Sequence, residues 1–157
     1  GKQQNILDHE LSIKAASYLP VNNAMIPTGV IEPVKDTPFD FAQSKAIRLQ
    51  LTAPHLQLQY GNGYDHCWIV DHPGSGINKV ATLIEKISVR KMEVFTNKPG
   101  LHVYSGNFLS ENFQQHSGVC LETQHFPDAP NQPHFPTTVL EPAEQYESTT
   151  IFKFSIQ

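Results

Sequence analysis

The stretch Gly118-Val-Cys-Leu-Glu-Thr-Gln-His-Phe-Pro-Asp-Ala-Pro-Asn-Gln-Pro133 alternates between polar and apolar residues and then enters a proline-rich loop. Alternation with period two is typical of a strand with one buried face, and the prolines end the strand. Glu122 lies near the end of this strand, where we expect Val119, Leu121 and Phe126 to shield it partly from water. A carboxylate held in this way can remove a proton from a hydroxyl group near neutral pH, so Glu122 is a candidate general base.

The same alternation recurs along the chain and predicts an all-β fold. The segments with this pattern are residues 11–15, 47–51, 56–60, 87–90, 92–95 and 150–156. No comparable stretch has helical periodicity, although Asp40 can cap a brief turn or helical piece at residues 41–45. Turns are expected at Pro27–Gly29, Pro73–Gly76 and Lys98–Gly100, because proline presets φ and glycine reaches positive φ. The sequence therefore predicts a single antiparallel module.

The composition restricts the classes of partner. The 157 residues are 39% hydrophobic and 17% charged, with a net charge of −4. This balance is typical of a soluble globular protein and argues against nucleic acid as a partner. No apolar run approaches the length that crosses a bilayer, and residues 1–10 are polar, so we expect no membrane partner and a cytoplasmic location. Cys67 and Cys120 lie in strand-like runs and are expected to be reduced, structural thiols.

Metal and cofactor motifs are not found in the sequence. The eight histidines show no HxH or HExxH spacing, and the two cysteines form no CxxC pair. The glycines form neither a phosphate-binding loop nor a dinucleotide fingerprint. We therefore expect no metal and no cofactor, although ligands can also converge only in the folded chain.

Several ordered motifs carry a family resemblance. These are Asp8-His9-Glu10, Gly63-Tyr64-Asp65-His66, Pro99-Gly-Leu-His-Val-Tyr-Ser-Gly-Asn-Phe-Leu109, and Leu121-Glu-Thr-Gln124 followed by Pro127-Asp-Ala129 and Asn131-Gln-Pro133. In this order they resemble the motifs of the aldose 1-epimerases, or galactose mutarotases. The resemblance implies a large antiparallel β-sandwich, of which residues 1–157 form the carboxy-terminal portion. Family members are single domains about twice as long, so an isolated half could leave open sheet edges. Such a half should pair with a complementary chain, dimerise or keep a rearranged closed fold.

The resemblance also implies a chemistry and a set of site residues. Family members are isomerases that interconvert the anomers of aldohexoses such as galactose or glucose by acid and base ring opening, without a cofactor. Glu122 resembles the base and Asp65 the carboxylate that binds sugar hydroxyls. His102 stands where many members carry glutamine, and Phe126 stands where a tryptophan often forms a ligand wall.

Each of these residues also has a purely structural interpretation. Glu122 can be a solvated strand-end carboxylate, and Asp65 a turn residue after Gly61-Asn62-Gly63. His102 can simply face outward from a strand, and most aromatic residues simply pack. His66 is expected on the opposite face from Asp65, where it orients the loop or fills the interior.

The resembling mechanism also needs a general acid. In the family this acid is a histidine on a segment upstream of the residues matched here. We therefore expect the acid to come from an amino-terminal half, as part of the same protein or as a companion chain. The alternative is a noncatalytic carbohydrate-binding or interaction module that keeps part of the cleft.

Overall fold

The computed structural model describes residues 5–71 and 76–157, so the turn expected at Pro73–Gly76 lies for the most part outside it. Within these residues the chain forms two five-stranded sheets with antiparallel pairing throughout. Sheet A has the order β10 (Thr150–Ile156), β7 (Arg90–Thr96), β6 (Asn78–Glu85), β1 (Glu10–Ile13) and β4 (Lys45–Ala46). Sheet B has the order β3 (Glu32–Pro33), β2 (Ser17–Leu19), β5 (Asp65–Ile69), β8 (Gly100–Tyr104) and β9 (Cys120–Gln124).

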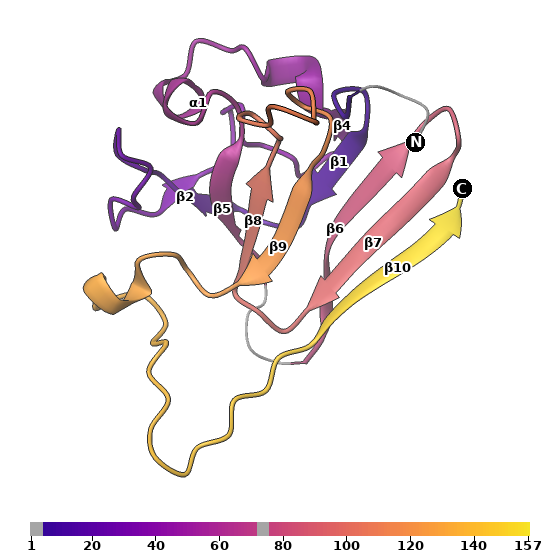
Figure 1. Ribbon diagram of the computed structural model, residues 1–157. Coiled ribbons are helices and arrows are strands. Elements are labelled where there is room, and N and C mark those ends of the chain that lie inside the picture. Colours follow the sequence, from indigo (N-terminus) through magenta and orange to yellow (C-terminus); the bar gives the residue numbers. More distant parts are fainter. Residues whose placement is uncertain (1–4, 72–75) are drawn as a thin grey trace.

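The two sheets face each other as a sandwich, and the predicted all-β fold class is confirmed (Figure 1). The short helical elements are η1 (Ile47–Gln50), α1 (Leu56–Gly61) and η2 (Ala129–Asn131). In the described part of the chain none of these helices is long and apolar enough to cross a membrane. The segment that joins β9 to β10 contains η2 and extends far from both sheets before β10 returns to the edge of sheet A (Figure 1).

The prediction of a strand at residues 56–60 is wrong, because these residues form α1. The His55 side chain accepts a hydrogen bond from the Gln57 N–H and so caps the amino end of the helix. At the other end, Asn62 adopts the left-handed conformation that commonly ends a helix. A run of five residues is too short for period-two alternation to decide between the two structures.

Two further strand predictions, for residues 47–51 and 87–90, are wrong, because most of these residues form a 3₁₀ helix and a turn. Residues 47–50 form the 3₁₀ helix η1, in which Ile47 is buried and Leu49 is exposed. Of residues 87–90 only Arg90 belongs to a strand, because the Glu85 carboxylate accepts from the N–H groups of Ile87 and Ser88 and closes a turn. No helix forms at residues 41–45, where Asp40 instead accepts a hydrogen bond from the Ala42 N–H.

Aromatic side chains fill the core at one end of the sandwich, which we call the closed end. Tyr18 stacks on Phe39 with ring centroids 4.3 Å apart, and the Trp68 indole N–H donates to the Phe39 carbonyl over 2.9 Å. Leu11 of sheet A is fully buried against this cluster. The predicted interior position of His66 and Trp68 is confirmed, because both side chains are fully buried.

The inner face of sheet A continues beyond the area that sheet B covers. In the register, Leu11 stands opposite Leu83, Leu83 opposite Met92, and Met92 opposite Phe154. Exposure rises along this row from 0% at Leu11 to 74% at Phe154. Leu83 and Met92 are partly buried at the margin of the core, and Phe154 and the neighbouring Ile156 are mostly exposed; we call the apolar surface of these four residues the open flank.

Candidate active site on the outer face of sheet B

The strand register brings Asp65, His102 and Glu122 onto the same face of sheet B. On β8, His102 pairs with Cys67 of β5 on one side and with Glu122 of β9 on the other. Tyr104, two residues further along β8, pairs with Asp65 and with Cys120 in the same way. Residues opposite each other in an antiparallel pair share a face, and so do residues two positions apart. All three predicted polar site residues therefore lie on the outer face, away from the aromatic core.

The two carboxylates of this face lie on different strands, and one of them is bound by His102. The His102 Nε2–H donates to Asp65 Oδ1 over 2.8 Å, and both side chains stay partly exposed. Glu122 is exposed to solvent. From strand spacings of about 4.8 Å and a residue rise of about 3.4 Å, the Cα atoms of Asp65 and Glu122 are roughly 12 Å apart. In the register, His102 lies on β8, between the strands that carry the two carboxylates.

His102 uses one ring nitrogen to hold Asp65. The other, Nδ1, is buried and has no hydrogen-bond partner among the described residues. The observed contact makes His102 a support for the Asp65 carboxylate. Its predicted role in binding a sugar hydroxyl stays a prediction.

His66 supports Asp65 from the buried side of the same strand. Its Nδ1 accepts a hydrogen bond from the Asp65 backbone N–H over 3.1 Å, so the proton of the neutral ring is on Nε2. Nε2 in turn donates to Gln57 Oε1 over 3.1 Å. Burial lowers the pKa of His66 to about 3, and the neighbouring His102 and His55 also favour its neutral form. The ring is thus an uncharged brace behind Asp65.

The loop before Asp65 is fixed by a polar group from a distant part of the chain. The Asn107 side-chain amide donates to the carbonyls of Gly61 and Tyr64 over 2.7 and 2.9 Å. Ser105 adds a hydrogen bond that its hydroxyl accepts from the Tyr64 N–H. Two of the sequence motifs, at residues 63–66 and 99–109, are therefore joined directly, and both hold the start of β5.

Phe126 is placed differently from the other predicted site residues. It is only 7% exposed and packs edge-to-face against Phe135, in a small cluster with Leu19 and Cys67. Gly100 lies beside this cluster and has no room for a side chain, because an added Cβ would meet Cys67 Sγ at 2.8 Å. Cys67 stands opposite His102 in the register, so Phe126 is buried beside the row that carries His102, and its role as a ligand wall stays a prediction.

Sequence reasoning missed two residues that share the site face. Tyr104 was expected only to pack and Cys120 only to be structural, yet both stand in the register row of Asp65. Burial raises the pKa of the Cys120 thiol, and the carboxylates of Glu122 and Asp65 raise it further. The sequence could have indicated both residues, because Tyr104 is two positions from His102 and Cys120 is two positions from Glu122, and residues two positions apart on a strand share a face.

Metal binding gains no support from the arrangement of side chains. Among residues 5–71 and 76–157, no group of three or more His, Cys, Asp or Glu is arranged to hold a metal ion.

Comparison with known proteins identifies relatives across nearly the whole chain. The family model described as aldose 1-epimerase matches residues 1–153. The chain is 42% identical to the galactose mutarotase of Bos taurus over 172 aligned residues, which cover 97% of this chain and 45% of that protein. It is 34% identical to the aldose 1-epimerase of Escherichia coli K12, with 98% of this chain and 47% of that protein covered.

Solved structures show the same fold. A GalM/aldose epimerase homologue from C. elegans superposes with a TM-score of 0.86 at 23% identity, covering 98% of this chain and 47% of that one. Galactose 1-epimerase from Lactobacillus acidophilus NCFM gives a TM-score of 0.83 at 29% identity, with 98% and 45% covered. The chain thus spans about half the length of the relatives it matches.

Proposed function

The chain belongs to the aldose 1-epimerase family, and from this premise we propose that it carries the base and the sugar-binding side of an enzyme that interconverts the anomers of galactose or glucose. The reaction needs a base at the anomeric hydroxyl and an acid at the ring oxygen. The sugar ring then opens, the aldehyde rotates, and the ring closes on the other face.

The observation that carries this proposal is the placement of Asp65, His102 and Glu122 on one open sheet face. Glu122 is exposed and lies on a rigid strand, so it can take the proton of the anomeric hydroxyl. Asp65, held by His102 and by His66, presents a fixed carboxylate that accepts hydrogen bonds from sugar hydroxyls. A sugar bound between the two carboxylates is held at both ends.

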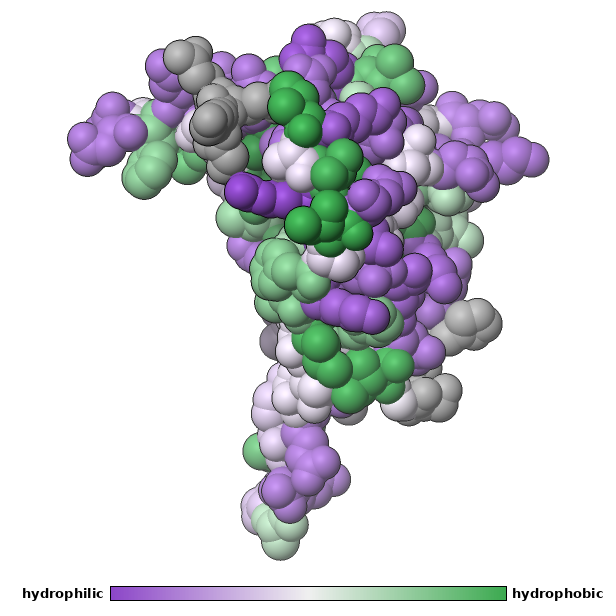
Figure 2. Space-filling view, turned by 90° about the vertical axis from the view of Figure 1, so that its right-hand side faces the viewer, coloured by the Kyte–Doolittle hydropathy of each residue, from purple (hydrophilic) through white to green (hydrophobic). Residues whose placement is uncertain are grey.

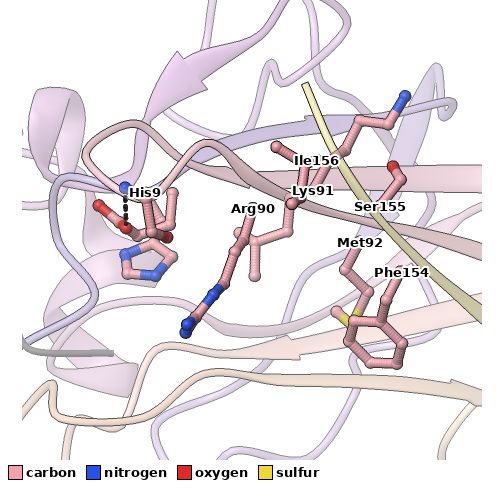
Figure 3. A pocket seen from close by; sticks show the side chains of 10 residues that line it. His9, Arg90, Lys91, Met92, Phe154, Ser155 and Ile156 are labelled. Carbon is pink, nitrogen blue, oxygen red and sulfur yellow. Dashed lines mark hydrogen bonds between the residues drawn. The ribbon is translucent and has the colours of Figure 1, made fainter.

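The general acid is proposed to come from a complementary amino-terminal half, in the same protein or in a companion chain. Support comes from the open flank, where the core of this chain continues without a cover. Met92 and Phe154 line a hollow of about 490 Å³ there, and Arg90 extends across it on the side of His9 (Figure 3). Viewed from this side, hydrophobic residues gather along the molecule between hydrophilic ones (Figure 2). A second sheet with an apolar face would complete the sandwich at this place.

The proposal is tested by polarimetry of freshly dissolved α-galactose together with native mass measurement. The chain is assayed alone and after co-expression with the amino-terminal part of the Bos taurus relative. In whichever form is active, Glu122→Gln should lower the rate of mutarotation by roughly 10²- to 10⁴-fold, the usual contribution of a general base. Glu147→Gln, which changes an exposed carboxylate in the loop before β10, is the matched control and should leave the rate unchanged.

Two results would contradict the proposal. One is a rate that Glu122→Gln does not change. The other is sugar binding without any acceleration in either form, which would favour a noncatalytic carbohydrate-binding module.

A further inference from the structure

Gln57 of α1 is a buried polar residue whose amide is fixed by the backbone of Val21. Its side chain is 8% exposed. The amide Oε1 accepts a hydrogen bond from the Val21 N–H over 2.7 Å, and Nε2 donates to the Val21 carbonyl over 2.9 Å. An amide turned the other way would set two donors and two acceptors against each other. The backbone of Val21 therefore decides that Oε1, and not Nε2, also faces His66.

This amide in turn decides which nitrogen of His66 carries the proton. Gln57 Oε1 lies 3.1 Å from His66 Nε2, and an amide oxygen can only accept, so Nε2 must donate. The other ring nitrogen, Nδ1, then keeps its lone pair and accepts from the Asp65 N–H over 3.1 Å. Burial lowers the pKa of His66 to about 3, so the ring stays neutral near pH 7. A buried path of hydrogen bonds thus leads from Val21 to the backbone of Asp65.

The end of α1 also packs directly behind Asp65. A Cβ added at Gly61 would lie 3.4 Å from the Asp65 Cβ and 3.5 Å from His66 Cε1. The carboxylate of Asp65 is bound by His102 on the outer face, and its backbone N–H is bound by His66 on the inner side. A binding group is held in its productive direction by hydrogen bonds of this kind, and small displacements of it weaken binding.

We propose that Gln57 and His66 are positioning residues for sugar binding, which set the direction of the Asp65 carboxylate through the Asp65 backbone N–H. This inference rests on the function proposed above, and it adds two buried residues to those that determine sugar affinity. In that function Asp65 binds hydroxyl groups and does not transfer the proton. Loss of positioning should therefore raise KM and leave kcat nearly unchanged.

Two substitutions of His66 separate positioning from a merely structural role. His66→Asn places an acceptor near the position of Nδ1, so the bond from the Asp65 N–H is kept and the contact with Gln57 is lost. His66→Gln places its amide near the position of Nε2, so the contact with Gln57 is kept and the Asp65 N–H is left unpaired. Both variants remove the same ring from the core. In whichever form is active, polarimetry should show a KM for galactose about tenfold higher in His66→Gln than in His66→Asn, which corresponds to roughly 1.4 kcal/mol.

The role of Gln57 is tested by nitrogen NMR of the His66 ring in this chain, a measurement that does not depend on sugar or turnover. The proton should be on Nε2 in the unsubstituted chain. Gln57→Met removes the acceptor at similar volume, so part of the protein should carry the proton on Nδ1, and KM should rise. These two measurements decide the matter even if the His66 variants do not fold.

Three outcomes would overturn the proposal. They are a proton on Nδ1 of His66 in the unsubstituted chain, equal KM values for folded His66→Asn and His66→Gln, and a Gln57→Met variant with unchanged KM. Failure of the proposed function is visible separately, as a KM that Asp65→Asn leaves unchanged or as mutarotation that Glu122→Gln leaves unchanged.

Discussion

The two ends of the inner face of sheet A have similar residues and opposite surroundings. At the closed end, Leu11 is fully buried in the same cluster as the aromatic rings of Tyr18 and Trp68 from sheet B. At the open flank, Phe154 lies three strands away in the same register row and is mostly exposed. Both residues are apolar and both point inward, so the difference lies only in what covers them. A strand's pattern decides which face is apolar, and a second layer decides whether that face becomes a core.

We expect the largest effect on stability from a substitution at the closed end, because this end holds the fold together. Leu11→Ala should lower the free energy of unfolding by about 2–5 kcal/mol, because it removes buried methyl groups and leaves a cavity under the rings. Urea denaturation followed by tryptophan fluorescence measures this loss at Trp68, the single tryptophan of the chain. A loss no greater than that of an exposed residue would contradict the difference between the two ends.

A second prediction concerns pH and the closed end. The pKa of His66 is about 3 in the folded chain and near 6.5 when unfolded. Between these values the His66 side chain binds a proton in the unfolded chain but not in the folded chain. The contribution of neutral His66 to the free energy of unfolding is therefore fully present above pH 6.5 and decreases as the pH is lowered. One such group contributes a slope of at most about 1.4 kcal/mol per pH unit.

Unfolding free energies between pH 4.5 and 6.5 test this slope. The carboxylates of Glu85, Glu93 and Asp128, whose pKa values are lowered, add to the slope mainly at the acidic end of this window, and they are the same in both proteins. His66→Asn keeps an acceptor for the Asp65 N–H and removes the titration, so its slope should be flatter. His9 and His125, whose pKa values burial also lowers, remain in the variant and supply the residual slope. Equal slopes for the two proteins would show that His66 is not the responsible group.

The smallest expected effect belongs to the open flank. Phe154→Ala should change the free energy of unfolding of the isolated chain by no more than about 0.5 kcal/mol, as expected for an exposed side chain. Urea denaturation again measures this change, and the Phe154→Ala and Leu11→Ala variants are compared in the same experiment. If a complementary half covers this surface, the substitution should instead weaken co-purification of the two halves. A large loss of stability in the isolated chain would mean that the open flank is already covered.

Alternation in the sequence predicted the long strands well and the short segments poorly. Residues 92–95 and 150–156 lie in strands β7 and β10, as predicted, because each pairs over seven residues with its neighbour. Residues 56–60 show the same alternation but form α1, since the capping by His55 and the turn at Asn62 outweigh the pattern over so few residues. Local hydrogen bonds that join residues two or three positions apart cannot be read from periodicity.

The sequence allowed the residues of the candidate site to be selected, but it did not predict the contacts between their side chains. Motif resemblance selected Asp65, His102 and Glu122, and the register places all three on one face. It gave no indication that His102 would donate to Asp65, because that contact spans 37 positions and depends on the pairing of β5 with β8. The same holds for the brace that His66 and Gln57 form behind the strand.

The Asn107 side chain has a consequence for the order in which the chain folds. It bonds the carbonyls of Gly61 and Tyr64 across 46 and 43 positions of sequence. Contacts of such separation form only after a long loop has closed, and loop closure slows the formation of β topologies. The start of β5, with Asp65, therefore reaches its final position only after β5 and β8 have paired.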